Sequence, residues 1–225
     1  MSRVASVPRI RAVAFDLDGL MFNTEEIFRH SGTELLRRRG ITPPPRLFQS
    51  MMGRRGEEAF AVLVEMCGLR EGIPELIIES ETIFFERLDA HLQPMPGLEQ
   101  LLARIELAGL NKGVATSSPR RYLHMLLDRF ELTDRFHATL TAEDVTHGKP
   151  NPEIYLKAAA ALGVEPAELL VLEDSEAGTR AAAAAGAHII SVPHDLSRDH
   201  DFSVAKGVAS RLNDPLIMEL FGLII

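Results

Sequence analysis

Short, apolar, β-prone segments recur along the chain, and polar residues follow several of them directly. Segments of this kind are typical of strands buried inside a sheet. Helical stretches separate them, and strands that alternate with helices predict a parallel sheet covered on both faces. We therefore expect an α/β fold with a doubly wound, Rossmann-like core whose strands lie within residues 10–15, 112–116, 137–140, 169–172 and 188–192.

The strand pattern disappears between Asn23 and Gln93, where apolar residues recur at helical spacing among acidic ones. This stretch predicts an all-helical cap domain inserted into the core, and turn-forming residues mark both of its borders. We expect the core to span residues 1–22 and 93–225 and the cap to span residues 23–92. The two chain crossings between these parts would form a hinge.

Composition argues against several classes of function. The 225 residues carry a formal net charge of −8 without any block of Lys or Arg, so nucleic acid is not an expected partner. Cys67 is the single cysteine, which excludes an intramolecular disulfide and a multi-thiolate zinc site and suits a reducing compartment. No apolar run is long enough to span a bilayer, and the first residues contain no signal-peptide core. We expect a cytoplasmic protein without membrane contact; the sequence does not determine the oligomeric state, and a monomer is the default expectation.

Polar side chains gather at the carboxyl ends of the predicted strands, where ligands bind in open α/β sheets. Asp16 and Asp18 follow the first strand, Thr116 ends the second, and Glu173 and Asp174 follow a later one. Asp16 and Asp18 are two residues apart, which in an extended chain places both carboxylates on one side. Such a pair can divide nucleophilic attack and proton transfer between its members.

These carboxylates predict a metal site. Gathered at one edge, they would repel one another unless a cation lay among them. Oxygen-only ligands favour magnesium, so Mg2+ is the expected cofactor. The candidate ligands are Asp16, Asp18, Glu173 and Asp174.

Two further segments carry groups that bind phosphate. Lys149 lies in a loop before a predicted helix, where its ammonium could offset charge on a phosphoryl group. Thr116-Ser117-Ser118 ends a strand and starts a helix, so hydroxyl and backbone N–H groups converge there. Ser118 and Pro119 are expected to be the N-cap and first-turn proline of that helix.

Each feature alone has a plainer interpretation. Asp-x-Asp-Gly is commonly a turn, a lysine before proline is usually solvated, and Thr-Ser-Ser before proline is usually an N-cap. Glu173-Asp174-Ser175 is equally compatible with a simple helix start. All four occur in order, each at a predicted strand end or helix start, so phosphoryl-transfer chemistry is a better explanation than coincidence.

The chain resembles the haloacid-dehalogenase superfamily, in the branch that contains β-phosphoglucomutase and its related sugar-phosphate phosphatases. Four ordered motifs carry the resemblance, namely Asp16-Leu17-Asp18-Gly19, Ala115-Thr116-Ser117, Lys149-Pro150 and Glu173-Asp174-Ser175 with Gly178. The resemblance implies that Asp16 is a nucleophile that forms an aspartyl-phosphate and that Asp18 is the general acid and base. It further implies that Thr116 and Lys149 stabilise the phosphoryl group, and that the metal is bound by Asp16, the Asp18 backbone carbonyl and Asp174, with Glu173 beside them.

Two departures from the mutases of this branch favour hydrolysis. Those mutases carry a cap histidine where this chain has Phe28, and a cap arginine where it has Gly56. Arg54 and Arg55 could compensate, although neither occupies the matching position. The expected substrate-binding residues are Gly53, Arg54, Arg55, Ser117 and Ser118. Within residues 52–55, 196–199 and 219–223 the chain looks most like pseudouridine-5′-phosphatases.

The expected function is therefore Mg2+-dependent hydrolysis of small phosphomonoesters, either sugar phosphates or nucleotide-like molecules. The first alternative is a β-phosphoglucomutase-like phosphosugar mutase, which shares every core residue. A distant alternative is a phospho-acceptor signalling module, which needs no helical insertion after the nucleophile strand. A catalytically idle binding protein would be expected to lack a motif residue, and none is missing.

Overall fold

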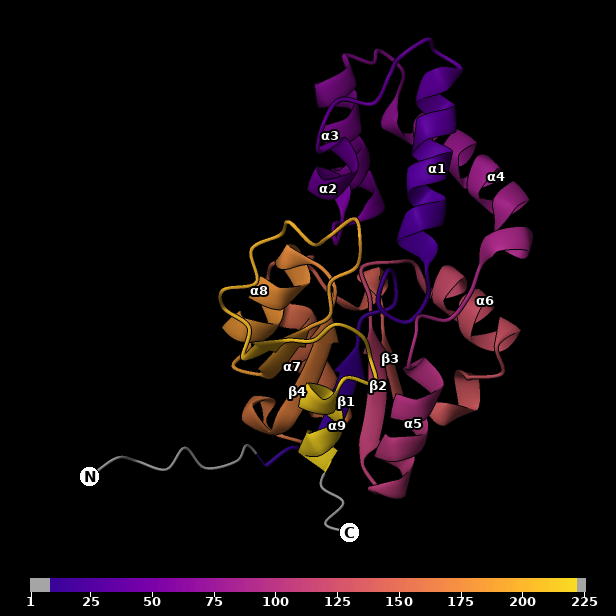
Figure 1. The fold of residues 1–225 in the computed structure, drawn as a ribbon. Helices are drawn as coiled ribbons and strands as arrows, with labels where there is room; N and C mark the ends of the chain where they lie inside the picture. The colour runs from indigo at the N-terminus through magenta and orange to yellow at the C-terminus, as the bar shows by residue number, and fades with distance from the viewer. Residues whose placement is uncertain (1–8, 222–225) are drawn as a thin grey trace.

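The computed structural model describes residues 9–221 and shows a helix-covered parallel sheet with a separate group of helices above it (Figure 1). The six strands are all parallel, in the order β3-β2-β1-β4-β5-β6. They are β1 (Ala12–Phe15), β2 (Asn111–Ala115), β3 (Ala138–Leu140), β4 (Leu169–Glu173), β5 (His188–Ser191) and β6 (Gly207–Val208). The predicted doubly wound α/β fold is confirmed. Strand β6 was not predicted, because two residues are too short to show a pattern.

Helices cover the sheet on both faces, so its central strands are apolar throughout. Helices α5 (Leu98–Leu107) and α6 (Arg120–Arg129) pack on one face, and α7 (Glu153–Ala161) and α8 (Glu176–Ala184) pack on the other. Along β1, Val13 and Phe15 face the first pair of helices, whereas Ala12 and Ala14 face the second. Small side chains on both sides of that second interface let α8 lie close to the sheet. The remaining core elements are η1 (Thr133–Arg135), η2 (Ala142–Asp144), η3 (Pro166–Glu168), α9 (Pro215–Met218) and η4 (Glu219–Phe221).

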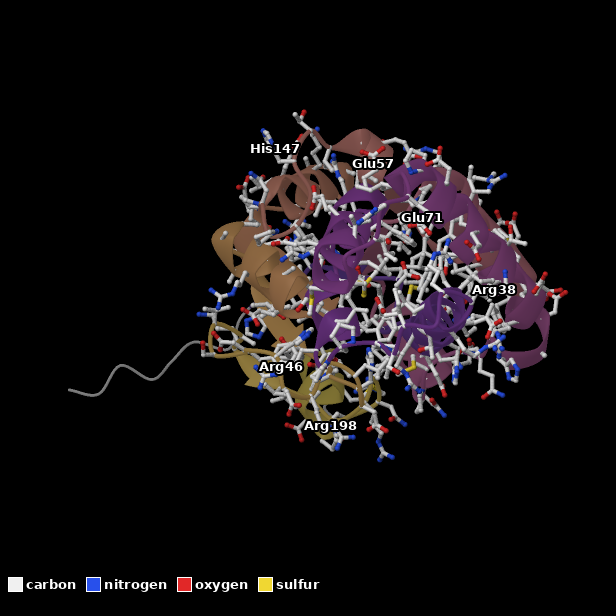
Figure 2. All side chains as sticks on the ribbon, turned by 90° about the horizontal axis from the view of Figure 1, so that it is seen from above. Arg38, Arg46, Glu57, Glu71, His147 and Arg198 are labelled. Carbon is white, nitrogen blue, oxygen red and sulfur yellow. The ribbon has the colours of Figure 1, made fainter. Side chains whose placement is uncertain are left out.

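The inserted segment is helical throughout, as predicted. It contains α1 (Thr24–Arg37), α2 (Leu47–Met51), α3 (Gly56–Cys67) and α4 (Ile73–His91). These helices bury an apolar cluster of their own, formed by Leu35, Leu36, Leu47, Leu63, Leu76 and Ile83. Charged side chains such as Arg38 and Glu71 project from the cap when it is seen from above (Figure 2). Within residues 9–221, no helix combines the length and the apolar character that crossing a bilayer requires.

The two chain crossings between cap and core lie side by side and are hydrogen-bonded to each other. The Asn23 backbone N–H donates to the Gln93 carbonyl at 3.1 Å, and its side-chain oxygen accepts from the Gln93 N–H at 2.7 Å. The Asn23 amide also donates to the His91 carbonyl at 3.0 Å. We propose these crossings as the boundaries of a cap at residues 23–92 and a core at 1–22 and 93–225, of which 1–8 and 222–225 lie outside the described residues.

A buried lysine at the start of β2 is neutralised by a carboxylate from α5. Lys112 is 2% exposed, and its ammonium lies 2.8 Å from Glu106. Arg135 also donates to Glu106, at 2.8 and 3.0 Å. The hydrogen bond from Arg135 lowers the pKa of Glu106 to about 2, with burial opposing and Lys112 assisting that shift. This ionic contact anchors β2 against α5, and β2 carries one of the polar strand ends.

We expect Glu106→Gln to lower the free energy of unfolding by about 1–2 kcal/mol at neutral pH, since Lys112 would face a neutral amide; the half-exposed carboxylate makes this less than a fully buried pair would lose. The folded-state pKa of Glu106 lies below its ordinary value. Its stabilisation is therefore complete above the ordinary value and is lost as the pH falls through the folded-state pKa. Urea unfolding at neutral and acidic pH measures both effects.

Glu99→Gln is the matched control, because Glu99 contacts the same Arg135 at 2.7 Å but is 71% exposed. We expect it to cost less than about 0.5 kcal/mol. Equal, small effects of the two substitutions would contradict the role given to Glu106.

Candidate active site

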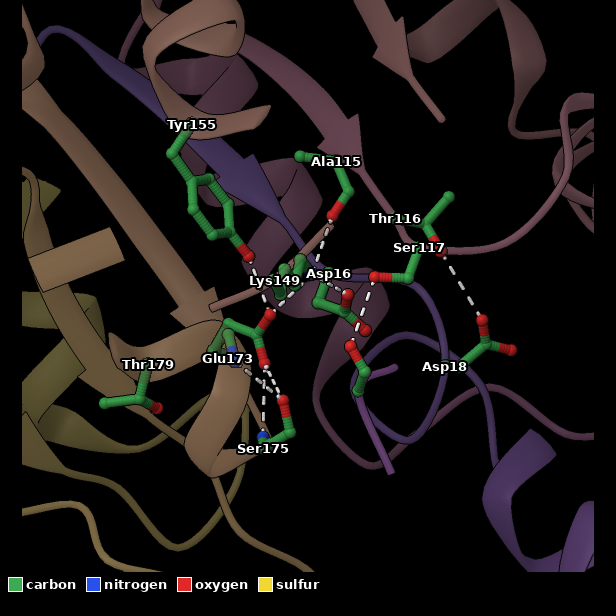
Figure 3. Close-up of polar contacts among 12 residues, drawn as sticks. Asp16, Asp18, Ala115, Thr116, Ser117, Lys149, Tyr155, Glu173, Ser175 and Thr179 are labelled. Atoms are coloured by element: carbon green, nitrogen blue, oxygen red, sulfur yellow. Dashed lines mark hydrogen bonds and ion pairs between the residues drawn. The ribbon is translucent and has the colours of Figure 1, made fainter. Parts of the chain in front are cut away.

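The polar strand ends meet at one edge of the sheet, beneath the cap (Figure 3). Strand order reverses at β1, with β2 and β3 on one side and β4 to β6 on the other, and such a switch point opens a crevice at the carboxyl ends of the strands. Asp16 directly follows β1, Thr116 follows β2, and β4 ends in Glu173. The loop before α7 adds Lys149, so four separate segments contribute to this edge.

Lys149 is the buried cation of the site. Its ammonium donates to Asp16 Oδ1, to Glu173 Oε1 at 2.6 Å and to the Ala115 carbonyl at 3.1 Å. These contacts use all three of its N–H donors. Although burial opposes it, the carboxylates of Asp16 and Glu173 raise the pKa of Lys149 well above its ordinary value. Lys149 therefore stays charged and holds the two carboxylates together.

Glu173 is fully buried, and both of its carboxylate oxygens are occupied. Oε1 accepts from Lys149 and from the Tyr155 hydroxyl, the latter at 2.7 Å. Oε2 accepts from the Ser175 backbone N–H at 3.1 Å and from the Ser175 hydroxyl at 2.9 Å. Against the opposing effect of burial, Lys149 and the other donors lower the pKa of Glu173. These contacts keep Glu173 ionised and hold its carboxylate against Lys149.

The side chains of Asp16, Glu173 and Asp174 fit a divalent cation. One oxygen from each lies within 4.8 Å of the others, and all three residues are buried. Burial raises the pKa of both Asp16 and Asp174 well above the ordinary value, and the neighbouring carboxylates raise each further. A hard cation bound to these oxygens would offset that repulsion. The carboxylate of Asp18 is not part of this cluster, and ligation through its backbone carbonyl stays a prediction.

Hydroxyl groups surround Asp18. Thr24 donates to Oδ1 at 2.7 Å and Tyr122 at 3.1 Å, while Ser118 donates to Oδ2 at 2.6 Å and Thr116 at 3.5 Å. Burial raises the pKa of Asp18, and the hydrogen bonds from Ser118, Thr24 and Tyr122 limit that rise. Asp16 is thus paired with an ammonium, as Glu173 is, whereas Asp18 is solvated by hydroxyls, and this difference suits Asp16 and Asp18 to different chemical roles.

Ser118 does not cap α6, contrary to the prediction. Pro119 occupies the N-cap position without a side-chain hydrogen bond, and the helix begins at Arg120. The Glu143 carboxylate accepts from the Arg120 N–H at 3.1 Å instead. A carboxylate from another segment has replaced the local cap, which leaves the Ser118 hydroxyl free to bind Asp18.

The predicted cap residues divide into two groups. Gly53 lies on the core, because its carbonyl accepts from the Ser117 hydroxyl at 3.2 Å and an added Cβ would come within 2.7 Å of Ser175 Oγ. Arg55 donates to two core carbonyls, Val145 at 2.6 Å and Ala142 at 3.3 Å. Arg54 is exposed and donates to the Ser50 carbonyl of the cap. Gly53 and Ser117 are thus brought together, whereas the arginine side chains contact backbone carbonyls.

Several site residues were missed in the sequence. Both tyrosines of the chain, Tyr122 and Tyr155, donate to site carboxylates. Each tyrosine lies in a helix that follows one of the motifs, and this position could have identified it in the sequence as a candidate site residue. Nothing in the local sequence around Glu25 or His194 indicated that either residue lies at the site. Burial raises the pKa of Glu25 well above its ordinary value, and the nearby carboxylates of Asp174 and Asp18 raise it further.

Sequence comparison with known proteins identifies hydrolases and phosphatases. The sequence model of the haloacid dehalogenase-like hydrolases matches residues 13–192. Validoxylamine A 7′-phosphate phosphatase of Streptomyces hygroscopicus subsp. limoneus is 33% identical over 197 residues, covering 85% of this chain and 87% of that protein. The phosphorylated carbohydrates phosphatase of Thermotoga maritima is 29% identical over 204 residues, covering 89% and 93%.

Crystal structures of CbbY from Rhodobacter sphaeroides share the fold. The complex with phosphate has a TM-score of 0.79 at 25% identity, and the two chains are covered to 90% for this protein and 95% for CbbY. A mutant in complex with xylulose-(1,5)bisphosphate has a TM-score of 0.77 with the same identity and coverage. The predicted superfamily and branch are confirmed, and the narrower likeness to pseudouridine-5′-phosphatases stays a prediction whose segment 219–223 extends beyond the described residues.

We expect Gly178→Ala to lower phosphate release from phosphomonoesters on the order of 10²-fold, as small misplacements of catalytic groups do. An added Cβ would lie 1.7 Å from Glu173 Oε1, and Glu173 cannot move without releasing Lys149 and Tyr155. Thermal unfolding and a phosphate-release assay measure the outcome. Gly56→Ala is the control, because nothing lies within 4 Å of its added Cβ. Wild-type turnover by Gly178→Ala would contradict the need for a fixed Glu173.

Proposed function

Because this chain belongs to the haloacid dehalogenase-like hydrolase family, we propose that it hydrolyses small sugar phosphates through an aspartyl-phosphate on Asp16. The chain is a phosphatase of phosphorylated sugars or other small metabolites, in the branch of sugar-phosphate phosphatases and β-phosphoglucomutase-like proteins. The observation that carries the finer proposal is the contact of Lys149 with Asp16 inside a buried acidic edge. That contact holds the proposed nucleophilic carboxylate beside a positive charge that can offset charge on a phosphoryl group.

The first step is attack of an Asp16 carboxylate oxygen on phosphorus. The P–O bond of the ester breaks, and Asp18 in its acid form gives its proton to the leaving oxygen. Burial raises the pKa of Asp18 above its ordinary value, the direction that a proton donor requires, and the hydrogen bonds from Ser118, Thr24 and Tyr122 limit that rise. Lys149 and the hydroxyl of Thr116 stabilise the charge on the transferred phosphoryl group.

The second step uses Asp18 as a base. Its carboxylate takes a proton from water, whose oxygen attacks phosphorus and releases phosphate, so that Asp16 is regenerated. Asp16, Asp174 and the backbone carbonyl of Asp18 would hold Mg2+, which supplies neutralisation of phosphate charge. We assign Glu173 to holding Lys149, because both of its oxygens already accept hydrogen bonds.

The proposed substrate class rests on the relatives and on the position of the cap. Two relatives are phosphatases whose names specify a phosphorylated carbohydrate or a 7′-phosphate, and a neighbouring structure contains a sugar bisphosphate. In the proposed mechanism the core residues act on the phosphoryl group, which leaves selection of the leaving group to the cap. The cap segment at Gly53 lies directly against Ser117, so cap and core are in contact there, and this supports a leaving group of modest size.

Two features of the cap favour hydrolysis over the mutase alternative. Phe28 stacks on Phe84 with ring centroids 4.3 Å apart and approaches Tyr122 at 6.1 Å, so apolar packing fills the place of the mutase histidine. Arg54 and Arg55 both donate to backbone carbonyls, which argues against their supplying a second phosphate site. A bisphosphate intermediate would need such a site in order to be held while it turns round.

We expect Asp16→Asn to reduce phosphate release on the order of 10³-fold or more, since an amide cannot attack phosphorus. Rapid quenching with labelled substrate should trap an acid-stable, hydroxylamine-sensitive phosphoprotein from the wild type and none from this variant. Asp134→Asn, the same change at an exposed aspartate, is the control. A phosphoprotein that persists in Asp16→Asn would remove Asp16 from the nucleophile role.

We expect phosphate release from sugar phosphates without conversion of β-glucose 1-phosphate to glucose 6-phosphate, because Phe28 can neither donate nor accept a hydrogen bond. The measurement supplies Mg2+ and catalytic glucose 1,6-bisphosphate and follows both products in one reaction. The same assay with excess chelator should show phosphate release collapse. Isomerisation faster than phosphate release would favour the mutase instead.

A further inference from the structure

We propose that His194 is a positioning residue that orients Asp174 for the divalent cation, an inference that rests on the proposed function for the presence of that cation. His194 lies in the loop that follows β5, and its Nε2 is 3.0 Å from Asp174 Oδ2. At this distance His194 is hydrogen-bonded to Asp174, which is one of the predicted metal ligands. None of the four motifs includes His194.

The other ring nitrogen fixes which atom donates. The Leu196 backbone N–H donates to His194 Nδ1 at 3.2 Å, so Nδ1 is an acceptor without a proton. A neutral imidazole with its proton on Nε2 satisfies both contacts, and Nε2–H then donates to Asp174. The ring is therefore a directional donor toward the carboxylate, not a competing metal ligand.

The loop holds this ring in place before any metal binds. The His194 N–H donates to the Ser197 hydroxyl at 3.1 Å, and the Ser197 N–H donates back to the His194 carbonyl at 3.1 Å. Ser197 is completely buried. These reciprocal bonds, with the contact from Leu196, fix the backbone and the ring of His194 together.

Gly19 packs against the contact between Asp174 and His194. Its φ is +78°, and an added Cβ would lie 2.5 Å from Asp174 Oδ2 and 2.8 Å from His194 Nε2. A side chain at position 19 would therefore displace both partners, so the first motif needs a glycine beside this hydrogen bond. The His194 contact uses Oδ2 of Asp174, and one carboxylate oxygen of Asp174 lies within 4.8 Å of oxygens of Asp16 and Glu173, where a cation could be shared.

His194 also lines a cavity that is large enough to hold many water molecules. The cavity has a volume of about 600 Å³ and is lined by His194 and Gly19 among others, but not by Asp174. A side chain that left this position empty would let water from the cavity reach Oδ2 of Asp174. Partners that orient ligating carboxylates typically contribute about 10–100-fold to metal affinity.

The test is direct metal binding, with Mn2+ as the probe, measured from the electron paramagnetic resonance signal of the free ion. We expect His194→Leu to weaken Mn2+ binding about 10–100-fold. His194→Gln should bind within a few-fold of wild type, because its terminal amide reaches the place of Nε2. His194→Asn should resemble His194→Leu, because its shorter amide stops near the place of Nδ1.

His30→Leu is the control, since His30 is 50% exposed on the cap. Circular dichroism of each metal-free variant shows that loss of affinity is not loss of fold, and rescue by Gln alone distinguishes donation from packing. Wild-type Mn2+ affinity in His194→Leu, or equal losses in Gln and Leu, would overturn the inference while leaving the phosphatase proposal intact. Failure of the wild type to bind Mn2+ would overturn both.

Discussion

The ammonium of Lys149 lies buried between the carboxylates of Asp16 and Glu173, and the other contacts of the site are arranged around this triad. Removing one partner from such a group leaves an uncompensated charge in a medium of low dielectric, which is strongly unfavourable. Tyr155, Ser175 and the Ala115 carbonyl occupy the remaining donor of Lys149 and both oxygens of Glu173. The triad therefore has one arrangement, and it joins β1, β4 and the loop before α7 at the edge of the sheet.

Excess negative charge follows from the same arrangement. Lys149 neutralises one charge, whereas Asp16, Glu173 and Asp174 all bring carboxylates to one buried point. Burial and mutual repulsion raise the pKa of Asp16 and of Asp174, so the edge favours the arrival of a cation. The carboxylate of Asp18 is kept apart from this cluster by its hydroxyl partners, which allows proton transfer and cation binding to be performed by different residues.

Cap and core share the environment of Asp18. Thr24 begins the first cap helix, whereas Ser118 and Tyr122 belong to the core, and all three donate to the same carboxylate. Arg55 ties the cap to the segment that leads into the Lys149 loop through the Val145 carbonyl. A movement of the cap would therefore alter the hydrogen bonding of Asp18, the proposed acid–base residue, so that cap closure and proton transfer would be linked.

The sequence by itself determined the fold class and the main site residues. Asp16, Thr116 and Glu173 each end a short apolar segment, and the carboxyl ends of parallel strands share one edge, so local pattern was enough to bring them together. Tertiary structure alone decided the partners, because Lys149 and Asp16 are 133 residues apart, and Tyr122 and Asp18 are 104 apart. The tertiary structure also shows that Ser118, the predicted helix cap, donates a hydrogen bond to Asp18 instead. Arg54 and Arg55 donate to backbone carbonyls. The direction of a polar side chain depends on which hydrogen-bond partners the fold brings close to it. Those partners are distant in the sequence, so local residue spacing cannot predict them.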